Sequence, residues 1–466
     1  MLKNAKASYH HRVLNDIRLN PRKCWKAINS IFPSKPNSAN STSNHDTMHT
    51  KVQQFGHYFA NVARELKSKA FPLVNFAWRH NNNTQALRTN QIFKFSFVFT
   101  IFVEKELRSL KRSKATGIDD LPPNLIKDCA TVIAKPLQNI INLSIKSSTV
   151  PALWKSAKVK PIFKSGDSDL VENFRPISIL PIFSKIVEKA VHRQFYNFLE
   201  NNKLLIDCQF GFRRNRSTKL AATLFCDKIR KEMDNGKLIG CVCVDLSTAF
   251  DTIGHGILLD KLPAYGVEGP ELAWFTDYLF NRTQLVEMQN NCCRPSTITT
   301  GVPQGSIVGP LMFIVFFNDL KESVKNSEII KYADDTVILY ADKDAQNIEN
   351  ALNEDMNLIR DYFYHNELLL HLKKGKTEVM LFGTSQRLRK SGKNLNITYS
   401  NTVINFVTEY VYLGNVIDNH MSLNGNFNRS YKRARGRLRL LQSVRRNLTA
   451  ASAIDIYNMT ILSILT

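Results

Sequence analysis

Residues 328–340 read EIIKYADDTVILY, and this stretch decides the fold. Two runs rich in β-branched and aromatic residues flank the sequence Ala333-Asp334-Asp335. Two such runs around a short polar centre are typical of a β-hairpin. We therefore expect the carboxylates of Asp334 and Asp335 at the tip of a hairpin.

A second stretch supplies a partner for that hairpin. Residues 238–244 read LIGCVCV, a continuous apolar run that indicates a buried strand, and Asp245 follows it directly. Three neighbouring carboxylates would repel one another, and a divalent cation with a preference for oxygen ligands removes that cost. Two such ions about 3.5–4 Å apart can activate an attacking hydroxyl and stabilise a leaving pyrophosphate. The alternative is that Asp334-Asp335 is only a polar turn.

The rest of the chain alternates helical and strand patterns. Apolar residues at helical spacing predict helices around residues 9–32, 52–66, 103–110, 122–133 and 182–199. Residues 33–44 read as a flexible linker. Long helical insertions between strands indicate an α+β fold.

Composition narrows the class of partner. The chain has 63 Lys and Arg against 40 Asp and Glu, a net charge of +23, which favours nucleic acid or an anionic membrane surface. No secretory signal opens the chain, and no apolar run is long enough to span a bilayer. The eight cysteines lack metal-binding spacing. We expect an intracellular protein, in the nucleus or cytoplasm, that does not enter a membrane.

Several motifs in order carry a family resemblance. Residues 114–119 (KATGID), 245–251 (DLSTAFD), 301–306 (GVPQGS) and 332–335 (YADD) occur between about residues 101 and 447. This series resembles the reverse transcriptase of non-LTR retrotransposons, the LINE-like, jockey-type elements. The resemblance implies a right-hand polymerase with fingers, palm and partial thumb. It also implies an enzyme that adds deoxynucleotides to a primer 3′-hydroxyl on an RNA template.

The resemblance also implies a domain organisation. Residues 1–100 would be a helical and linker region that precedes the polymerase. Residues 101–418 would form the reverse transcriptase domain, fingers and palm, with a core at about 145–418. Residues 419–466 would begin a basic helical thumb and stop early within it. Residues 431–446 hold seven Lys and Arg and no acid, and we expect them to contact duplex backbone.

The implied catalytic residues follow from the same motifs. Asp245, Asp334 and Asp335 would hold two Mg²⁺ ions, for which Mn²⁺ could substitute, with the Leu246 carbonyl as an additional ligand. Lys376 would be the general acid for pyrophosphate departure. The alternative for Lys376 is a solvated lysine, because the spacing before it is longer than in the family.

The resemblance further implies a nucleotide site. Arg175 is the first candidate for the triphosphate and Lys158 or Lys164 the second, and a guanidinium suits phosphate oxygens. Phe250 would lie under the sugar and exclude a 2′-hydroxyl. Gln304 and Gly305 would contact nucleotide and template.

A second block suggests template contact. Residues 209–218 read QFGFRRNRST, with three arginines beside two phenylalanines. Such a surface suits a nucleic-acid backbone with a stacking option. The alternative is that each arginine is merely solvated.

Two further interpretations remain open for the whole chain. It could be a catalytically silent remnant of a broken element that still binds nucleic acid. It could also be a host-domesticated or intron-type reverse transcriptase. No segment matches the endonuclease or the zinc knuckle of complete elements.

Overall fold

The computed structural model describes residues 45–70, 89–289, 291–392, 394–422, 424–445 and 448–465, together with Ser8, Tyr9 and Arg12. Almost all of the helix predicted at 9–32 and the linker predicted at 33–44 lie outside the described residues. The chain divides into a unit of residues 44–407 and a second unit to which residues 408–466 belong. The larger unit includes the 45–70 helix.

The first sheet is built on the two stretches that the sequence singled out. Its strand order is β12-β9-β3-β8-β7. The bounds are β3 Leu238–Val244, β7 Glu328–Tyr332, β8 Asp335–Asp342, β9 Glu378–Phe382 and β12 Asn405–Phe406. All seven residues of β3 are buried, as the apolar run predicts. The predicted hairpin is confirmed as the antiparallel pair β7–β8.

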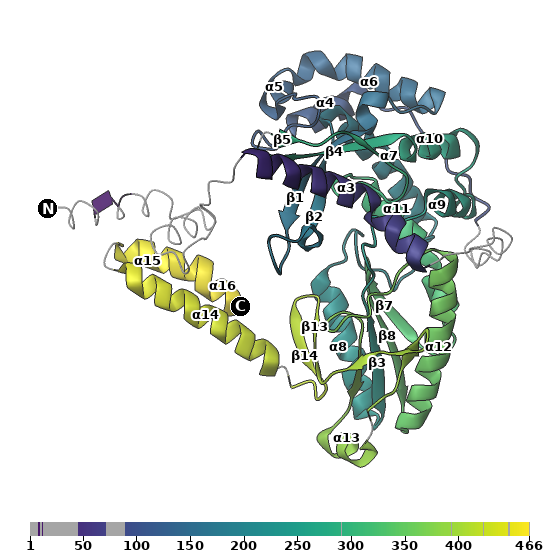
Figure 1. The fold of residues 1–466 in the computed structure, drawn as a ribbon, viewed down its shortest axis with the longest axis vertical. Coiled ribbons are helices and arrows are strands. Elements are labelled where there is room, and N and C mark those ends of the chain that lie inside the picture. Colours follow the sequence, from purple (N-terminus) through teal and green to yellow (C-terminus); the bar gives the residue numbers. More distant parts are fainter. Residues whose placement is uncertain are drawn as a thin grey trace. The chain divides into compact units, whose positions relative to one another are not determined.

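Two helices enclose this sheet. Helices α8 (Thr218–Asp234) and α12 (Ala345–His365) both pack on β3, and Figure 1 shows the sheet between them. Gly240 permits the close approach of α12, because a Cβ there would lie 2.3 Å from Ile348 Cγ2. Because helices pack on the sheet, a functional site can form at the ends of its strands but not on its faces.

The second sheet has the order β2-β1-β4-β5, with β6 also paired to β4. The bounds are β1 Ser156–Phe163, β2 Phe174–Ile179, β4 Arg282–Met288, β5 Asn291–Cys292 and β6 Ser296–Ile298. Helix α3 (His45–Ala70) packs against β4, β5 and β6 through a small core that includes Val52 and Phe55. This helix extends the predicted 52–66 segment at both ends.

Further helices of the larger unit pack on one another. They are α4 Thr100–Arg108, α5 Pro123–Asp128, α6 Ala130–Ser147, α7 Ile182–Asn201, α9 His255–Lys261, α10 Gly269–Leu279 and α11 Gly309–Phe316. The prediction of one helix through 122–133 is wrong, because it breaks into α5 and α6 at Cys129. Val132, expected on the apolar face, is instead 79% exposed, because α6 buries Ala130 and Ala134.

Short elements complete the larger unit. They are α13 Ser385–Ser391, β10 Thr398–Tyr399 and β11 Thr402–Val403. The second unit contains a hairpin of β13 (Glu409–Tyr412) and β14 (Asn415–Asp418), followed by α14 Asn424–Val444, α15 Ala450–Tyr457 and α16 Ser463–Leu465. No helix in the described part of the chain combines the length and the hydrophobicity needed to cross a bilayer.

Candidate active site

The ladder between β3 and β8 brings the predicted carboxylates together. Its last pair joins Val244 to Thr336, so Asp245 and Asp335 follow at the next position on the two antiparallel strands. Side chains opposite each other in such a ladder have Cβ atoms about 5 Å apart. Asp334 lies beside them in the two-residue turn of the β7–β8 hairpin, because Tyr332 pairs with Asp335.

The electrostatics of these carboxylates favour a cation. Burial, then repulsion from Asp334 and Asp245, raises the pKa of Asp335 to about 6. Burial also raises the pKa of Asp334, and Asp245 adds to the shift. A bound cation would stabilise the ionised forms, and carboxylate oxygens are hard donors that suit Mg²⁺. The residues present therefore fit a divalent ion.

Asp245 is held by residues from the segment after α12. Its Oδ2 lies 3.0 Å from Lys376 Nζ and 3.2 Å from His371 Nδ1. The main-chain N–H of His371 also donates to the Asp245 carbonyl. Within the described ranges, no three His, Cys, Asp or Glu side chains are placed closely enough to form a metal-binding cluster. Lys376 is therefore placed next to Asp245, one of the three predicted carboxylates.

The second sheet places basic groups near the same carboxylates. Residue 162 of β1 pairs with Arg175 of β2, and Lys164 follows β1 with its N–H donating to Asn173. Burial, followed by repulsion from Lys376 and Arg175, lowers the pKa of Lys164. Both Lys164 and Arg175 in turn act to lower the pKa of Asp334. This electrostatic coupling links the hairpin β1–β2 to the turn that carries the Asp pair.

Lys158 is placed differently from Lys164. Its Nζ lies 3.0 Å from Asp120 Oδ1 and 3.6 Å from Glu287 Oε1, and its side chain is only 11% exposed. These carboxylates already neutralise the ammonium group. Of the two lysines proposed for the triphosphate, Lys164 is therefore the stronger candidate.

Phe250 is fixed by two other rings. It stacks on Phe313 of α11 with ring centroids 4.7 Å apart, and Phe212 meets it edge-on at 6.0 Å. Val302 N–H donates to the Phe250 carbonyl, which joins this segment to the 301–306 loop. The ring is half-buried, so one side is packed while part of it stays accessible.

Gln304 has a partner that the sequence did not suggest. Its Nε2 donates to both carboxylate oxygens of Asp251, at 2.9 and 2.8 Å. Burial raises the pKa of Asp251 to about 6, and the Gln304 hydrogen bond opposes that shift. Gly305 is exposed, and a Cβ there would lie 2.4 Å from the Ser178 carbonyl oxygen. Asp251 lies within the 245–251 motif, but only the fold reveals its contact with Gln304.

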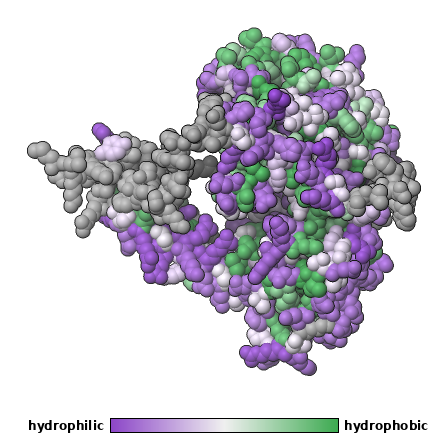
Figure 2. Space-filling view, viewed as in Figure 1, coloured by the Kyte–Doolittle hydropathy of each residue, from purple (hydrophilic) through white to green (hydrophobic). Residues whose placement is uncertain are grey.

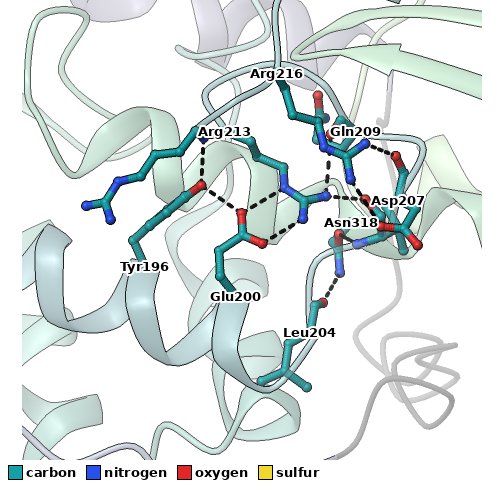
Figure 3. A network of polar contacts seen from close by, with 10 residues as sticks. Tyr196, Glu200, Leu204, Asp207, Gln209, Arg213, Arg216 and Asn318 are labelled. Atoms are coloured by element: carbon teal, nitrogen blue, oxygen red, sulfur yellow. Dashed lines mark hydrogen bonds and ion pairs between the residues drawn. The ribbon is translucent and has the colours of Figure 1, made fainter. Parts of the chain in front are cut away.

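The arginines of the 209–218 block are largely paired within the protein (Figure 3). Arg213 donates to both carboxylate oxygens of Glu200, at 2.9 and 2.7 Å, and its side chain is 7% exposed. Arg216 is paired with Asp207, and Arg214 lies over the Tyr196 ring. These guanidinium groups are bound within the protein, so Arg213 has few hydrogen-bond donors left for a template.

The basic helix of the second unit is longer than expected. Helix α14 begins at Asn424, before the predicted 431–446 segment, and its visible surface in Figure 2 is mainly hydrophilic. Lys432, Arg433 and Arg435 are exposed on it. Arg437 instead donates to the Thr460 carbonyl at 2.5 Å. Arg437 thus links α14 to the segment around Thr460, while most of the other arginines of α14 are exposed to solvent.

Comparison with known proteins decides the family. A family model described as "Reverse transcriptase (RNA-dependent DNA polymerase)" matches residues 162–417. The chain belongs to the reverse transcriptase family. The match includes the whole first sheet, all of the second sheet except most of β1, and Asp245, Asp334 and Asp335. A mixed α+β unit is consistent with such a domain.

Named relatives confirm the predicted kind of reverse transcriptase. The chain is 28% identical over 274 residues to the "Probable RNA-directed DNA polymerase from transposon BS" of Drosophila melanogaster, covering 56% of this chain and 29% of that protein. It is 24% identical over 367 residues to the "RNA-directed DNA polymerase from mobile element jockey" of the same species, covering 76% and 39%. The chain thus spans about a third of the length of these relatives.

Proposed function

We propose that this chain is an RNA-directed DNA polymerase of a retrotransposon. It would add deoxynucleotides to the 3′-hydroxyl of a DNA primer on an RNA template. The observation that carries this proposal is the convergence of separate elements on one strand end. Asp245 follows β3, Asp334 lies in the β7–β8 turn, and Asp335 begins β8. Lys376 Nζ lies 3.0 Å from Asp245 Oδ2.

The proposal assigns parts of a right hand to the two sheets. The first sheet would be the palm and the second sheet the fingers, within a polymerase domain of residues 101–418. Residues 419–466, with exposed basic side chains on α14, would begin the thumb and contact the primer–template duplex. The region before residue 101 would support the fingers, because α3 packs on β4 to β6.

Metal binding would fall to Asp245, Asp334 and Asp335, with the Leu246 carbonyl as a further oxygen donor. Mg²⁺ or Mn²⁺ bound there would neutralise the carboxylates, activate the primer hydroxyl and stabilise the leaving pyrophosphate. The raised pKa of Asp335 supports this assignment, since a carboxyl that resists ionisation alone gains from a cation.

The remaining candidates would bind the deoxynucleoside triphosphate. Arg175 and Lys164 would hold its phosphates, and Lys376 Nζ would give a proton to the departing pyrophosphate oxygen. The Phe250 ring, held by its stack on Phe313, would close the space that a 2′-hydroxyl needs. Gln304, oriented by Asp251, would present its carbonyl oxygen to nucleotide or template.

Primer extension on an RNA template with Mg²⁺ tests the proposal. We expect the purified chain to incorporate deoxynucleotides, and Asp335→Ala to abolish incorporation while it still binds RNA. Incorporation by Asp335→Ala at the wild-type rate would refute the assignment. Asp342→Ala is a matched control, because Asp342 is the last residue of the same strand, far from the turn.

A second candidate function is nucleic-acid binding without catalysis. One observation favours it: Asp245 Oδ2 is engaged by both Lys376 and His371. Salt-dependent RNA binding with no extension in Mg²⁺ or Mn²⁺ would support this candidate.

A further inference from the structure

The turn that carries the Asp pair has an unusual backbone. Tyr332 pairs with Asp335, so Ala333 and Asp334 are the two central residues of the hairpin. Ala333 has φ of 58°, and Asp334 does not share this positive φ. A positive φ at the first central position is typical of a type II′ turn, where glycine is the usual residue. A side chain there costs about 1–2 kcal/mol, so something else must hold the turn.

One buried side chain contacts both polar groups of the Ala333 main chain. Gln209 Oε1 accepts the Ala333 N–H at 2.9 Å, and its Nε2 donates to the Ala333 carbonyl at 3.4 Å. The same Oε1 accepts the Gly211 N–H at 2.7 Å. Gln209 is only 1% exposed, so these bonds are shielded from water.

The main chain around Gln209 runs along the same hairpin. Phe210 N–H donates to the Lys331 carbonyl at 2.7 Å, and Lys331 N–H donates to the Cys208 carbonyl at 2.8 Å. Gly211 completes the contact, because a Cβ there would lie 2.3 Å from the Ala333 nitrogen. The segment 208–211 therefore lies directly against the turn, and its register is fixed by its own backbone.

The arginines in Figure 3 also bind the main chain next to Gln209. Arg213, bound to Glu200 of α7, also donates to the Ile206 carbonyl at 2.7 Å. Arg216 donates to the Asp207 carbonyl at 2.5 Å. Gln209 thus projects from a loop that is anchored independently of the hairpin.

We propose that Gln209 is the positioning residue of the Asp334–Asp335 pair. Its carboxamide holds Ala333 in the left-handed conformation and so fixes where the two carboxylates point. The inference rests on the proposed function and deepens it, because it assigns part of the 209–218 block to the catalytic turn instead of to the template. Gln209 acts through the backbone and is not itself a catalytic residue.

The test replaces the carboxamide and keeps its volume. Gln209→Met removes both hydrogen-bonding groups. We expect Mn²⁺ binding to the protein alone, followed by electron paramagnetic resonance, to weaken by about 10–100-fold, as when an outer partner of a metal ligand is lost. In primer extension, kcat should fall by a similar factor, while the KM for deoxynucleotide and the affinity for RNA stay within about twofold.

A matched control exists on α7. Gln194 makes the same pair of hydrogen bonds, with Oε1 accepting the Ser96 N–H at 2.7 Å and Nε2 donating to the Ser96 carbonyl at 3.0 Å. Gln194→Met should leave Mn²⁺ affinity and kcat unchanged. Adding Ala333→Gly to Gln209→Met should recover part of the Mn²⁺ affinity, because glycine adopts positive φ without steric cost. A purely structural role for Gln209 would show no such recovery.

The outcomes separate this inference from the polymerase proposal. Wild-type affinity for Mn²⁺ together with wild-type kcat in Gln209→Met would overturn the positioning role. Wild-type protein that binds Mn²⁺ through Asp335 but extends no primer would overturn the polymerase proposal alone. If Gln209→Met does not fold, Gln209→Asn keeps the carboxamide but withdraws it by one methylene. Unchanged Mn²⁺ binding in that variant would also overturn the positioning role.

Discussion

Two basic regions of this protein look alike in sequence and differ in structure. The hairpin β1–β2 presents Lys164 and Arg175, and the loop 209–216 presents Arg213 and Arg216. The first pair interacts electrostatically with the catalytic-motif carboxylates. In the second pair, each arginine is bound by a carboxylate of its own neighbourhood, Glu200 or Asp207.

The difference teaches that a basic residue must be judged with its partners. A guanidinium already bound by a carboxylate on two donors has little left for phosphate, whereas a cation close to other cations gains from an incoming anion. We therefore expect substitutions of Lys164 and Arg175 to change catalysis, and substitutions of Arg213 and Arg216 to change stability.

The largest effect should follow removal of Arg175. Because this side chain is exposed, Arg175→Ala should leave the melting temperature unchanged. It should lower kcat/KM for deoxynucleotide by about 10²–10³-fold, as for loss of one charge-stabilising donor. Arg175→Lys keeps the positive charge but loses the planar guanidinium, which can bind two phosphate oxygens at once. It should therefore recover only part of the activity. Steady-state primer extension measures both, and an unchanged kcat/KM in Arg175→Ala would remove this residue from the site.

Arg213 should behave in the opposite way. Arg213→Ala leaves the Glu200 carboxylate with the Tyr196 hydroxyl but without its guanidinium partner, which should cost about 1–3 kcal/mol of unfolding free energy. Urea unfolding measures the loss. Adding Glu200→Gln should restore most of it, because no uncompensated charge then remains. A stable Arg213→Ala protein with weakened RNA binding would instead favour template contact.

Within the second sheet, substitutions of Lys164 and Lys158 should lower catalysis to different extents. Lys164→Ala should lower kcat/KM for deoxynucleotide by on the order of tenfold, as expected for a hydrogen bond to a charged group. Lys158→Ala should lower it less, since Asp120 and Glu287 already neutralise that ammonium. Equal losses in the two variants, measured in the same extension assay, would contradict the distinction drawn from their partners.

The smallest effect concerns Lys331, a lysine wholly inside the protein. Its Nζ donates to the Phe317 carbonyl, and burial lowers its pKa to about 8, with Cys208 and Asp319 opposing the shift and Lys261 adding to it. Because the folded pKa lies below the unfolded one, the unfolded chain binds more protons between pH 8 and 10.5. Stability should therefore rise with pH there, by about 1 kcal/mol between pH 7.5 and 9.

Lys331→Met tests whether Lys331 causes this rise of stability with pH. The variant should lose this part of the pH dependence, as measured by urea unfolding at several pH values. A pH profile identical to that of the wild type would show that Lys331 does not titrate in this range.

The predictions from sequence were most reliable where one physical signal dominated. The apolar run 238–244 indicated a buried strand and the two β-rich runs around Asp334 indicated a hairpin, and the structure confirms both. The single helix predicted at 122–133 was wrong, since apolar spacing does not record the break at Cys129. The contacts of Gln209 with Ala333 and of Gln304 with Asp251 were missed, because residues 124 and 53 positions apart leave no local pattern.

From the sequence we could predict the three strands that carry Asp245, Asp334 and Asp335, and the order of the motifs. These features depend on residues that are close in the chain, where hydrophobic periodicity and turn chemistry act. Only the tertiary structure shows which charged side chains are already paired within the protein and which can bind a substrate. Ion pairs such as Arg213 with Glu200 and Lys158 with Glu287 form across long separations, and the fold alone brings these side chains together. The same Asp334–Asp335 pair can be read from the sequence, while the hydrogen bonds that hold its turn come from Gln209, far away in the chain.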